Sequence, residues 1–238
     1  MLDSVDSTNA YGFRLGATPA WVLAAEQTAG RGRRGRTWSS PRGNFYGSLI
    51  LSPHDPPERM ALRSFVAALA LRDALVAMTG LPDAFTLKWP NDVLLNGGKL
   101  SGILLEGKGG RLAIGIGVNL IVAPPPDEVE VRALRPVSLW DQTGLTITPV
   151  QLLDRLAPAF ATREAQLAAD FDTIRRDFLT YAARLGEPIT ARTMRETHEG
   201  VFRTIDVTGA LVLDTDAGAI AIPAADIFFG GQADASGH

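Results

Sequence analysis

Short apolar runs separated by tight-turn residues fill residues 85–119, and they constrain the fold more than any other part of the chain. The Asn-Gly-Gly triplet at 96–98 is typical of a hairpin, because hairpin turns need residues that tolerate φ > 0. A Gly-Gly pair at 109–110 marks a second turn. The apolar runs at 85–89, 93–95, 99–106 and 112–119 therefore predict a mostly antiparallel meander.

Helices and further strands are expected on both sides of this meander. Ser7 or Thr8 can cap a short helix, and alanine and leucine at helical spacing predict a long one in the first half of the chain. Pro158 should break or kink a later helical region, whereas the proline-rich stretch 121–135 is expected to form a mobile loop. The expected helices are 8–15, 57–79 and 149–185, and the expected additional strands are 21–25 and 45–51.

A change of composition at 186–188 separates two regions. Short β-rich segments alternate with turns over 189–229, which is most simply a small β-barrel. We therefore expect a domain at 1–186, a barrel at 187–232 and a disordered tail at 233–238. The 238 residues are 46% hydrophobic and 21% charged and contain no cysteine, which excludes disulfides and thiolate metal sites. No signal peptide and no apolar run of ~18 residues is present, so we expect a cytoplasmic protein without a membrane partner.

The run Gly-Arg-Gly-Arg-Arg-Gly-Arg at 30–36 is the most distinctive local pattern. Four arginines in seven residues repel one another, and a bound anion is the simplest compensation. Glycine lets backbone amides approach an anion closely, and arginine offers a planar fork for phosphate or carboxylate oxygens. A solvated loop and a nucleic-acid patch are the competing interpretations. The formal net charge of −3 argues against broad nucleic-acid binding, so the anion clamp is favoured.

A second candidate cluster is Lys-Trp-Pro-Asn-Asp at 88–92, which places a lysine at a strand end and a carboxylate in the following turn. Lys88 can face an anion while Asp92 orients a lysine or a hydrated magnesium ion. A surface hairpin with a structural tryptophan explains the run equally well. Lys99 follows the hairpin glycines, where lysines often protect exposed strand edges, although its place opposite Lys88 makes it a plausible second clamp group.

Glycines inside the predicted strands point to close approach of a ligand. Gly102, Gly115 and Gly117 are of this kind, and Asn119 ends the same strand as a turn former or a polar contact. The Gly-Ile-Gly at 115–117 ends a strand rather than opening a helix, so it is no dinucleotide fingerprint.

Together these motifs resemble the biotin–protein ligase family (biotin–[acetyl-CoA-carboxylase] ligase). The resemblance is close over residues 3–145 and depends on five motifs in the family's order. They are Asp-Ser-Thr-Asn at 6–9, the Glu-Gln-Thr-Ala and Arg/Gly run through Trp38 at 26–38, Lys-Trp-Pro-Asn-Asp at 88–92, Gly-Lys-Leu-Ser-Gly-Ile-Leu at 98–104 and Gly-Ile-Gly-Val-Asn at 115–119.

The resemblance implies an α+β fold, in which a mixed, mostly antiparallel sheet backed by helices is followed by a small SH3-like β-barrel. It also implies a two-step reaction with ATP and Mg²⁺. Biotin and ATP give biotinyl-5′-AMP, and a lysine of a biotin carboxyl carrier protein domain then takes the biotinyl group. Two anions must meet in the first step, so positive charge and positioning suit it better than a covalent nucleophile.

The resemblance assigns roles to matching positions in this sequence. The catalytic residues would be Lys99, Arg33, Arg31, Lys88 and Asp92. Asp92 would also contact magnesium indirectly, through the water shell of the ion. The biotin site would comprise Ser7, Thr8, Asn9, Gln27, Gly30, Arg31, Gly32, Arg33, Trp38, Lys99, Gly102 and Gly115, and the ATP site Arg33, Arg36, Trp38, Lys88, Asn91 and Asn119.

Other functions stay open at this point. A lipoate or octanoate ligase of the same fold is the nearest enzymatic alternative, and a non-catalytic biotin- or nucleotide-binding protein is another. Ser7 lies almost at the start of the chain, so we expect neither the N-terminal helix-turn-helix of some relatives nor sequence-specific DNA binding. The family normally has a strand before Asp3, of which this chain supplies little. Exposed sheet edges could pair between two copies of the chain, so the sequence does not decide whether a homodimer forms.

Overall fold

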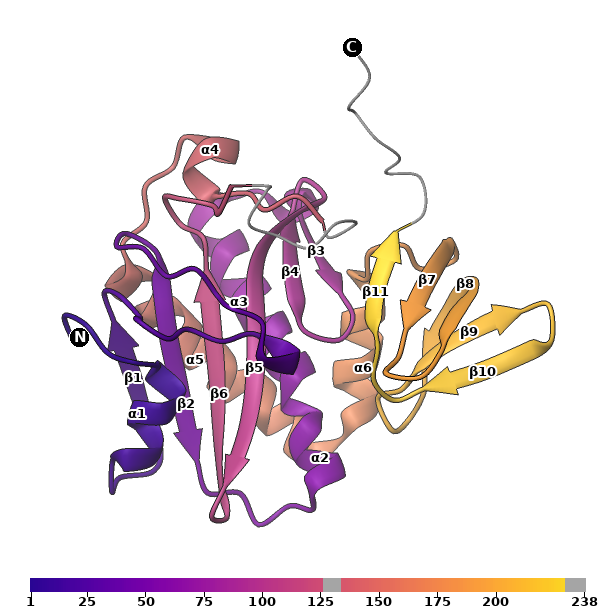
Figure 1. Ribbon diagram of the computed structural model, residues 1–238, viewed down its shortest axis with the longest axis horizontal. Coiled ribbons are helices and arrows are strands. Elements are labelled where there is room, and N and C mark those ends of the chain that lie inside the picture. Colours follow the sequence, from indigo (N-terminus) through magenta and orange to yellow (C-terminus); the bar gives the residue numbers. More distant parts are fainter. Residues whose placement is uncertain (126–133, 230–238) are drawn as a thin grey trace.

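The computed structural model describes residues 1–125 and 134–229. A six-stranded antiparallel sheet forms its centre, with the strand order β1-β2-β6-β5-β4-β3 (Figure 1). The meander β3 to β6 predicted from the turn residues is confirmed, because each of these strands pairs antiparallel with the next. The strands are β1 (Ala20–Ala24), β2 (Phe45–Leu51), β3 (Phe85–Lys88), β4 (Asp92–Leu95), β5 (Gly98–Lys108) and β6 (Arg111–Val118).

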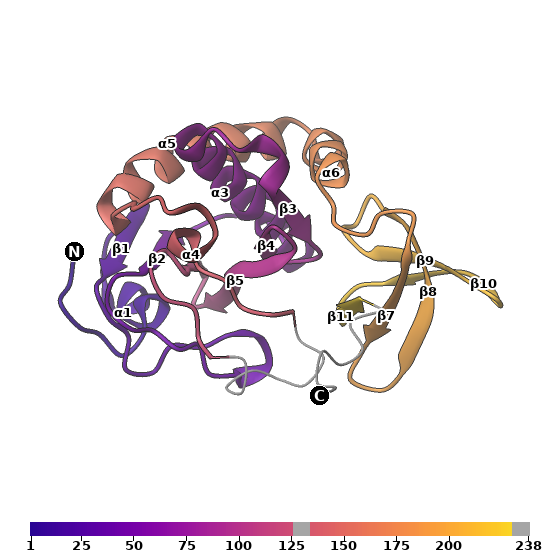
Figure 2. The same cartoon turned by 90° about the horizontal axis from the view of Figure 1, so that it is seen from above.

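Helices cover both faces of the sheet, but unequally (Figure 2). The long helices α3 (Arg63–Thr79) and α5 (Pro149–Ala169) lie on one face, and the short helix α1 (Thr8–Arg14) lies on the other. The main core lies under the long helices, where Leu69 and Leu71 are fully buried. The face that carries α1 is left partly uncovered by helices, and it is there that the pocket described below lies. The remaining helices are α2 (Pro57–Ala61), α4 (Leu139–Thr143) and α6 (Phe171–Thr180), with 3-10 turns η1 (Arg33–Gly35) and η2 (Pro82–Ala84).

Two predicted helices differ from those observed. The helix expected over 57–79 is divided into α2 and α3 at Leu62, whose N–H bonds to Arg59 O three residues back rather than four. The break expected at Pro158 was wrong, because α5 continues through this residue. The chain breaks instead at Asp170, whose carboxylate accepts the first N–H groups of α6 and so caps it.

The N-terminal residues cover the edge of the sheet at β1. Leu2 pairs with Ala24 and Val5 pairs with Gln27 as parallel bridges. The backbone N–H of Leu2 donates to Leu23 O at 2.7 Å, and Ala25 N–H donates back to Leu2 O. These residues therefore satisfy part of the edge that an additional strand would pair with.

The C-terminal region is a five-stranded antiparallel sheet with the order β10-β9-β8-β7-β11 (Figure 1). This confirms an all-β module after the helices. The strand pairings among the described residues do not join β10 to β11, so the closed barrel expected from the sequence is not seen in them. The strands are β7 (Pro188–Arg192), β8 (Thr197–Ile205), β9 (Leu211–Thr215), β10 (Gly218–Ile222) and β11 (Asp226–Phe229).

Two expectations fall partly or wholly outside the described residues. The mobile loop predicted at 121–135 includes residues 126–133, and the disordered tail predicted at 233–238 lies beyond residue 229. No helix in the described part of the chain is long and apolar enough to cross a membrane.

Candidate active site

A pocket of about 560 Å³ lies on the α1 face of the central sheet. Its walls come from the start of α1, the Arg/Gly loop, strands β3 to β6, and the first residues of β11, with further contributions from Pro124, Leu134 and Pro136. The floor of the pocket includes Gly102, Gly115 and Gly117, where a Cβ would collide with the side chains of Trp38 or Asn9. The pocket therefore joins elements that are distant in sequence, including the C-terminal module.

One end of the pocket is polar and uncharged. Gln27 Oε1 accepts two hydrogen bonds from Thr8, one from its backbone N–H at 2.9 Å and one from its hydroxyl at 3.1 Å. The sequence assigned the cap of α1 to Ser7 or Thr8, but the Ser7 side chain makes no capping bond, and Gln27 accepts the Thr8 N–H instead. Because its oxygen is used in this way, its Nε2 points to Ser40 Oγ at 3.1 Å.

Asn9 is the second anchor of the polar end and is 2% exposed. Its Oδ1 accepts from Ser48 Oγ at 2.6 Å, and its Nδ2 donates to Glu106 Oε2 at 2.8 Å. The side chain lies directly over Gly115, where an added Cβ would be 2.7 Å from Asn9 Oδ1. The glycine is therefore needed to seat the asparagine, and the asparagine amide has a fixed orientation.

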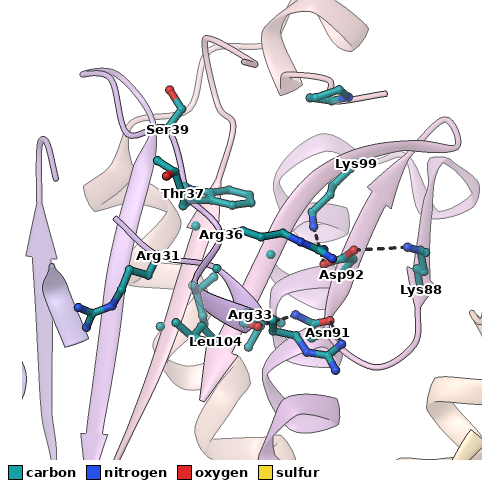
Figure 3. A pocket seen from close by; sticks show the side chains of 18 of the residues that line it. Arg31, Arg33, Arg36, Thr37, Ser39, Lys88, Asn91, Asp92, Lys99 and Leu104 are labelled. Carbon is teal, nitrogen blue, oxygen red and sulfur yellow. Dashed lines mark hydrogen bonds and ion pairs between the residues drawn. The ribbon is translucent and has the colours of Figure 1, made fainter. Parts of the chain in front are cut away.

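The other end of the pocket is cationic and centred on Asp92. Lys99 Nζ lies 3.0 Å from Asp92 Oδ1, and Lys88 Nζ lies 3.9 Å from Oδ2 (Figure 3). The hairpin between β3 and β4 and the next strand bring the two lysines to one carboxylate, as the sequence predicted. Burial lowers the pKa of Lys88 to about 8, which the charge of Asp92 only partly offsets.

The arginines of the Arg/Gly loop extend this cationic end toward the C-terminal module. Arg34 Nη1 and Arg36 Nη2 lie 2.7 and 2.5 Å from Asp226 Oδ2. Arg33 donates to Ala225 O at 3.2 Å and to Asn91 Oδ1 at 3.4 Å (Figure 3). From the sequence, a bound anion was expected to offset the repulsion among the loop arginines. In the structure the carboxylate of Asp226 supplies part of that negative charge.

Trp38 lies between the two ends, with its indole over the glycine floor. A Cβ added at Gly117 would lie 2.5 Å from its Nε1, and one at Gly102 would lie 3.0 Å from its ring. Lys99 Nζ is 5.7 Å from the ring centroid, which is within reach of a cation–π contact. The buried Nε1 has no hydrogen-bond partner among the described residues. The indole donor is thus left unpaired against the glycine floor.

Comparison with known proteins places this pocket in a family. Residues 2–121 match the Biotin/lipoate A/B protein ligase family, and residues 185–230 match the biotin protein ligase C terminal domain. A biotin–[acetyl-CoA-carboxylase] ligase from Paracoccus denitrificans is 52% identical over 97% of this chain and 100% of its own length. This chain belongs to the biotin/lipoate A/B protein ligase family.

More distant relatives agree with this family. The biotin–[acetyl-CoA-carboxylase] ligase of Mycobacterium tuberculosis is 32% identical over 87% of this chain and 77% of its own length. The biotin protein ligase from Aquifex aeolicus, solved in complex with biotin and ATP, has a TM-score of 0.83. The two are 26% identical, and the match covers 95% of each chain. The resemblance drawn from the five sequence motifs is confirmed.

The predicted site residues of this family member converge with one exception. Gly30 does not line the pocket; a Cβ there would lie 2.6 Å from both Ser40 Oγ and Trp38 O, so its glycine permits the loop to pack. Asn119 lines the pocket but is 2% exposed, and its amide donates to Val137 O. The predicted site residues that do line the pocket are Ser7, Thr8, Asn9, Gln27, Arg31, Gly32, Arg33, Arg36, Trp38, Lys88, Asn91, Asp92, Lys99, Gly102, Gly115 and Asn119.

Three residues that bond to side chains of the site were not predicted from the sequence of this ligase-family chain. Ser48 and Glu106 each interrupt an apolar strand, and Asp226 does the same near the C-terminus. A polar side chain inside an apolar run signals a partner in the fold. The sequence contained that signal, but it gave no indication of which partner each residue would meet.

The donor set does not form a metal centre by itself. Asp92 is the one carboxylate at the lysine cluster, and no group of three or more histidine, cysteine or acidic residues suited to a metal ion occurs among residues 1–125 and 134–229. A magnesium ion would thus arrive with the phosphates of its nucleotide, as part of the substrate.

Proposed function

We propose that the chain is an ATP-dependent ligase that forms biotinyl-5′-AMP and transfers the biotinyl group to a lysine of a biotin carboxyl carrier protein domain. The observation that carries this proposal is the single pocket that joins an uncharged polar end to a cationic end. A ligand with a polar, neutral head and an anionic tail fits that order, and the cationic end accepts a triphosphate beside the tail.

In the first step a carboxylate oxygen of biotin forms a bond to the α-phosphorus of ATP. The bond from that phosphorus to the bridging β-phosphate oxygen breaks, and pyrophosphate leaves. Lys99, Arg33 and Lys88 reduce the repulsion between the two anions and stabilise the charge of the transition state. Arg31, Arg36 and Asn91 would position the substrates, and Asp92 holds both lysines in place through their ion pairs.

In the second step the neutral amine of the carrier lysine attacks the acyl carbon of the mixed anhydride. The carbon–oxygen bond to AMP breaks, AMP leaves as an anion, and the new amide loses one proton to water. Both steps are assisted by placing the reacting groups together rather than by a covalent intermediate on the enzyme.

The polar end favours biotin over lipoate. A ureido head can add hydrogen bonds to the Thr8, Asn9 and Gln27 cluster, whose atoms are already bonded within the chain. The dithiolane of lipoate has no N–H or C=O group for such bonds, and a net hydrogen bond is worth about 0.5–1.5 kcal/mol, so a few of them discriminate between the two acids. Trp38, with its indole at the middle of the pocket, would stack on the adenine, and its ring is well placed for this contact.

Magnesium enters this proposal as part of the nucleotide substrate. The carboxylates that line the pocket are Asp92 and Asp226, and both are already paired with cations. Asp92 would contact the ion through its water shell.

The test is ATP–pyrophosphate exchange with the purified protein, magnesium and each of biotin, lipoate and octanoate. We expect exchange with biotin alone, followed by transfer to an isolated carrier domain and not to the same domain with its acceptor lysine replaced by arginine. Exchange with lipoate or octanoate instead of biotin would show that the substrate is that acid and not biotin. No exchange with any acid, in a protein that still binds biotin, would favour a binding protein.

A further inference from the structure

We propose that Glu106 is a positioning residue that couples the Arg/Gly loop to the polar end of the pocket. This proposal rests on the proposed function, since it concerns how the polar end receives biotin. Glu106 does not line the pocket, and the sequence predicts it only as the last residue of the strand at 99–106. Its two carboxylate oxygens nevertheless bind the buried amide of the polar end and an arginine of the loop.

The first oxygen fixes Asn9. Asn9 Nδ2 donates to Glu106 Oε2 at 2.8 Å, so Asn9 must turn its Oδ1 toward Ser48, which lies 2.6 Å away. A carboxylate only accepts hydrogen bonds, so the amide cannot be flipped without facing an acceptor with an acceptor. Glu106 therefore decides which atom of Asn9 is presented on the pocket side.

The second oxygen holds Arg31. Arg31 Nη2 lies 3.4 Å from Glu106 Oε1, and Arg31 lines the pocket from the loop side. The side chains of both partners are partly exposed, at 45% for Arg31 and 31% for Glu106. A contact of this kind is weak enough to open when a ligand enters, and strong enough to bias the position of a loop.

The strand that carries Glu106 makes the arrangement rigid. Glu106 stands on β5 opposite Ala113 of β6, and it faces the α1 side together with Gly102 and Leu104. Any shift of the loop that moves Arg31 thus acts on the same carboxylate that orients Asn9. Glu106 therefore links Arg31 of the loop to Asn9 of the polar end.

Two substitutions separate the two contacts. Glu106→Gln keeps an oxygen that can accept from Asn9 but removes the charge that holds Arg31. Glu106→Ala removes both. Biotin affinity, measured by titration calorimetry without ATP, should weaken about two- to fivefold for Glu106→Gln, as expected for a half-exposed ion pair. It should weaken about tenfold or more for Glu106→Ala, because the buried amide also loses its charged acceptor.

The decisive comparison repeats both substitutions in the Arg31→Ala protein. There Glu106→Gln should have no further effect on biotin affinity, while Glu106→Ala should still weaken it. In the otherwise unchanged protein, Glu106→Gln should raise KM for biotin in pyrophosphate exchange and leave kcat unchanged. Equal losses from Glu106→Gln in both backgrounds, or full biotin affinity in Glu106→Ala, would overturn the proposal.

Hydrogen exchange of the loop supplies a readout that does not depend on biotin. Without added ligand, amides of residues 30–37 should exchange faster in both Glu106→Gln and Arg31→Ala, and no faster in the double variant than in either single one. If the unsubstituted protein binds no biotin, the proposed function fails while this measurement still decides the role of Glu106. Unchanged exchange in Glu106→Gln would contradict that role.

The matched control is Asp214→Asn. It breaks another exposed arginine–carboxylate pair, with Arg203 at 3.3 Å on the C-terminal sheet. We expect it to leave biotin affinity and loop exchange unchanged, which excludes a general effect of removing a surface carboxylate. Equal thermal unfolding midpoints for all variants establish that the fold is kept.

Discussion

The two ends of the pocket are built by different means. At the polar end, Thr8 and Asn9 sit on helix α1 and Gln27 follows strand β1, and all three side chains already have hydrogen-bond partners. At the cationic end, the arginines belong to a loop and hold a carboxylate of the C-terminal module, Asp226. The first end has the shape that a ligand needs, whereas the second must give up partners when phosphates bind.

This difference follows from charge. At the polar end, neutral donors and acceptors satisfy most of each other's bonds at little cost, and the charged partner of Asn9, Glu106, lies outside the pocket lining. Several cations cannot share a site without an anion, because bringing like charges together in a medium of low polarity is costly. Asp92 and Asp226 supply that anion to the lysines and to the loop arginines. A triphosphate would then compete with Asp226 for the arginines, which links nucleotide binding to the contact between the loop and the C-terminal module.

The largest expected effect tests the cationic end. Lys99→Ala should lower the rate of biotinyl-5′-AMP formation by about a hundredfold to a thousandfold, as expected when a group that stabilises charge in the transition state is lost. Arg33→Ala should behave likewise. Pyrophosphate exchange measures the rate, and circular dichroism should show an unchanged fold. Normal exchange in both variants would remove these residues from the clamp.

A second prediction tests the preformed polar end. Gly115→Ala would place a Cβ 2.7 Å from Asn9 Oδ1, so the amide must move or lose its bond to Ser48. We expect KM for biotin to rise by about tenfold to a hundredfold, corresponding to the loss of one or two buried hydrogen bonds. KM for ATP should change little.

The control for that prediction is Gly107→Ala on β5. No atom lies within 4 Å of a Cβ at this position, so its KM for biotin should be unchanged. An equal rise in KM for both variants would show that the polar end is more adaptable than the comparison implies.

The third prediction uses the pH dependence of the cationic end. Burial lowers the pKa of Lys88 to about 8, so its positive charge is fully present below that pH and is lost as the pH rises through it. If this charge assists adenylation, kcat/KM for ATP should fall above pH 8, by up to about tenfold per pH unit. The Lys88→Met variant should lack this fall, and retention of the same profile in the variant would assign it to another group.

The lowered pKa of Lys88 affects stability in the opposite direction: activity should fall as the pH rises, whereas the contribution of this group to stability should rise. Lys88 titrates near 8 in the folded protein but near 10.5 in an unfolded chain. Between these values the unfolded chain binds more protons, so stability from this group rises with pH. Lys88→Met should therefore not lower the unfolding midpoint at pH 7, which separates its role in catalysis from a role in folding.

The two ends of the pocket also differ in how much of their structure could be predicted from the sequence. The meander, the glycine floor and the lysine pair followed from turn residues and local spacing, because these depend on neighbours in the chain. The contact between Arg36 and Asp226 joins residues 190 positions apart, and no local pattern specifies it. Pro158 shows the same limit, since packing of α5 on the core outweighed the local preference for a break.

The smallest expected effect concerns Asp226, which connects the loop to the C-terminal module. Its burial acts to raise its pKa, but hydrogen bonds and charges from Arg36 and Arg34 outweigh this and hold the pKa below 3.8. A carboxyl whose pKa is lowered on folding contributes stability that is present above its unfolded value and is lost as the pH falls through the folded value. Asp226→Asn should therefore lower the free energy of unfolding at pH 7 by about 1–2 kcal/mol, since the pair is partly exposed.

The difference between the variant and the unsubstituted protein should shrink as the pH falls below about 4, where the carboxylate is protonated in the unfolded chain and then in the folded one. Denaturant unfolding at pH 7 and pH 3 measures both values. The control is Asp214→Asn, whose partner Arg203 is 59% exposed and whose effect at pH 7 should be negligible. A difference that stays constant from pH 7 to pH 3 would mean that Asp226 acts through packing rather than charge, and the contrast between the two ends of the pocket would then lose its electrostatic basis.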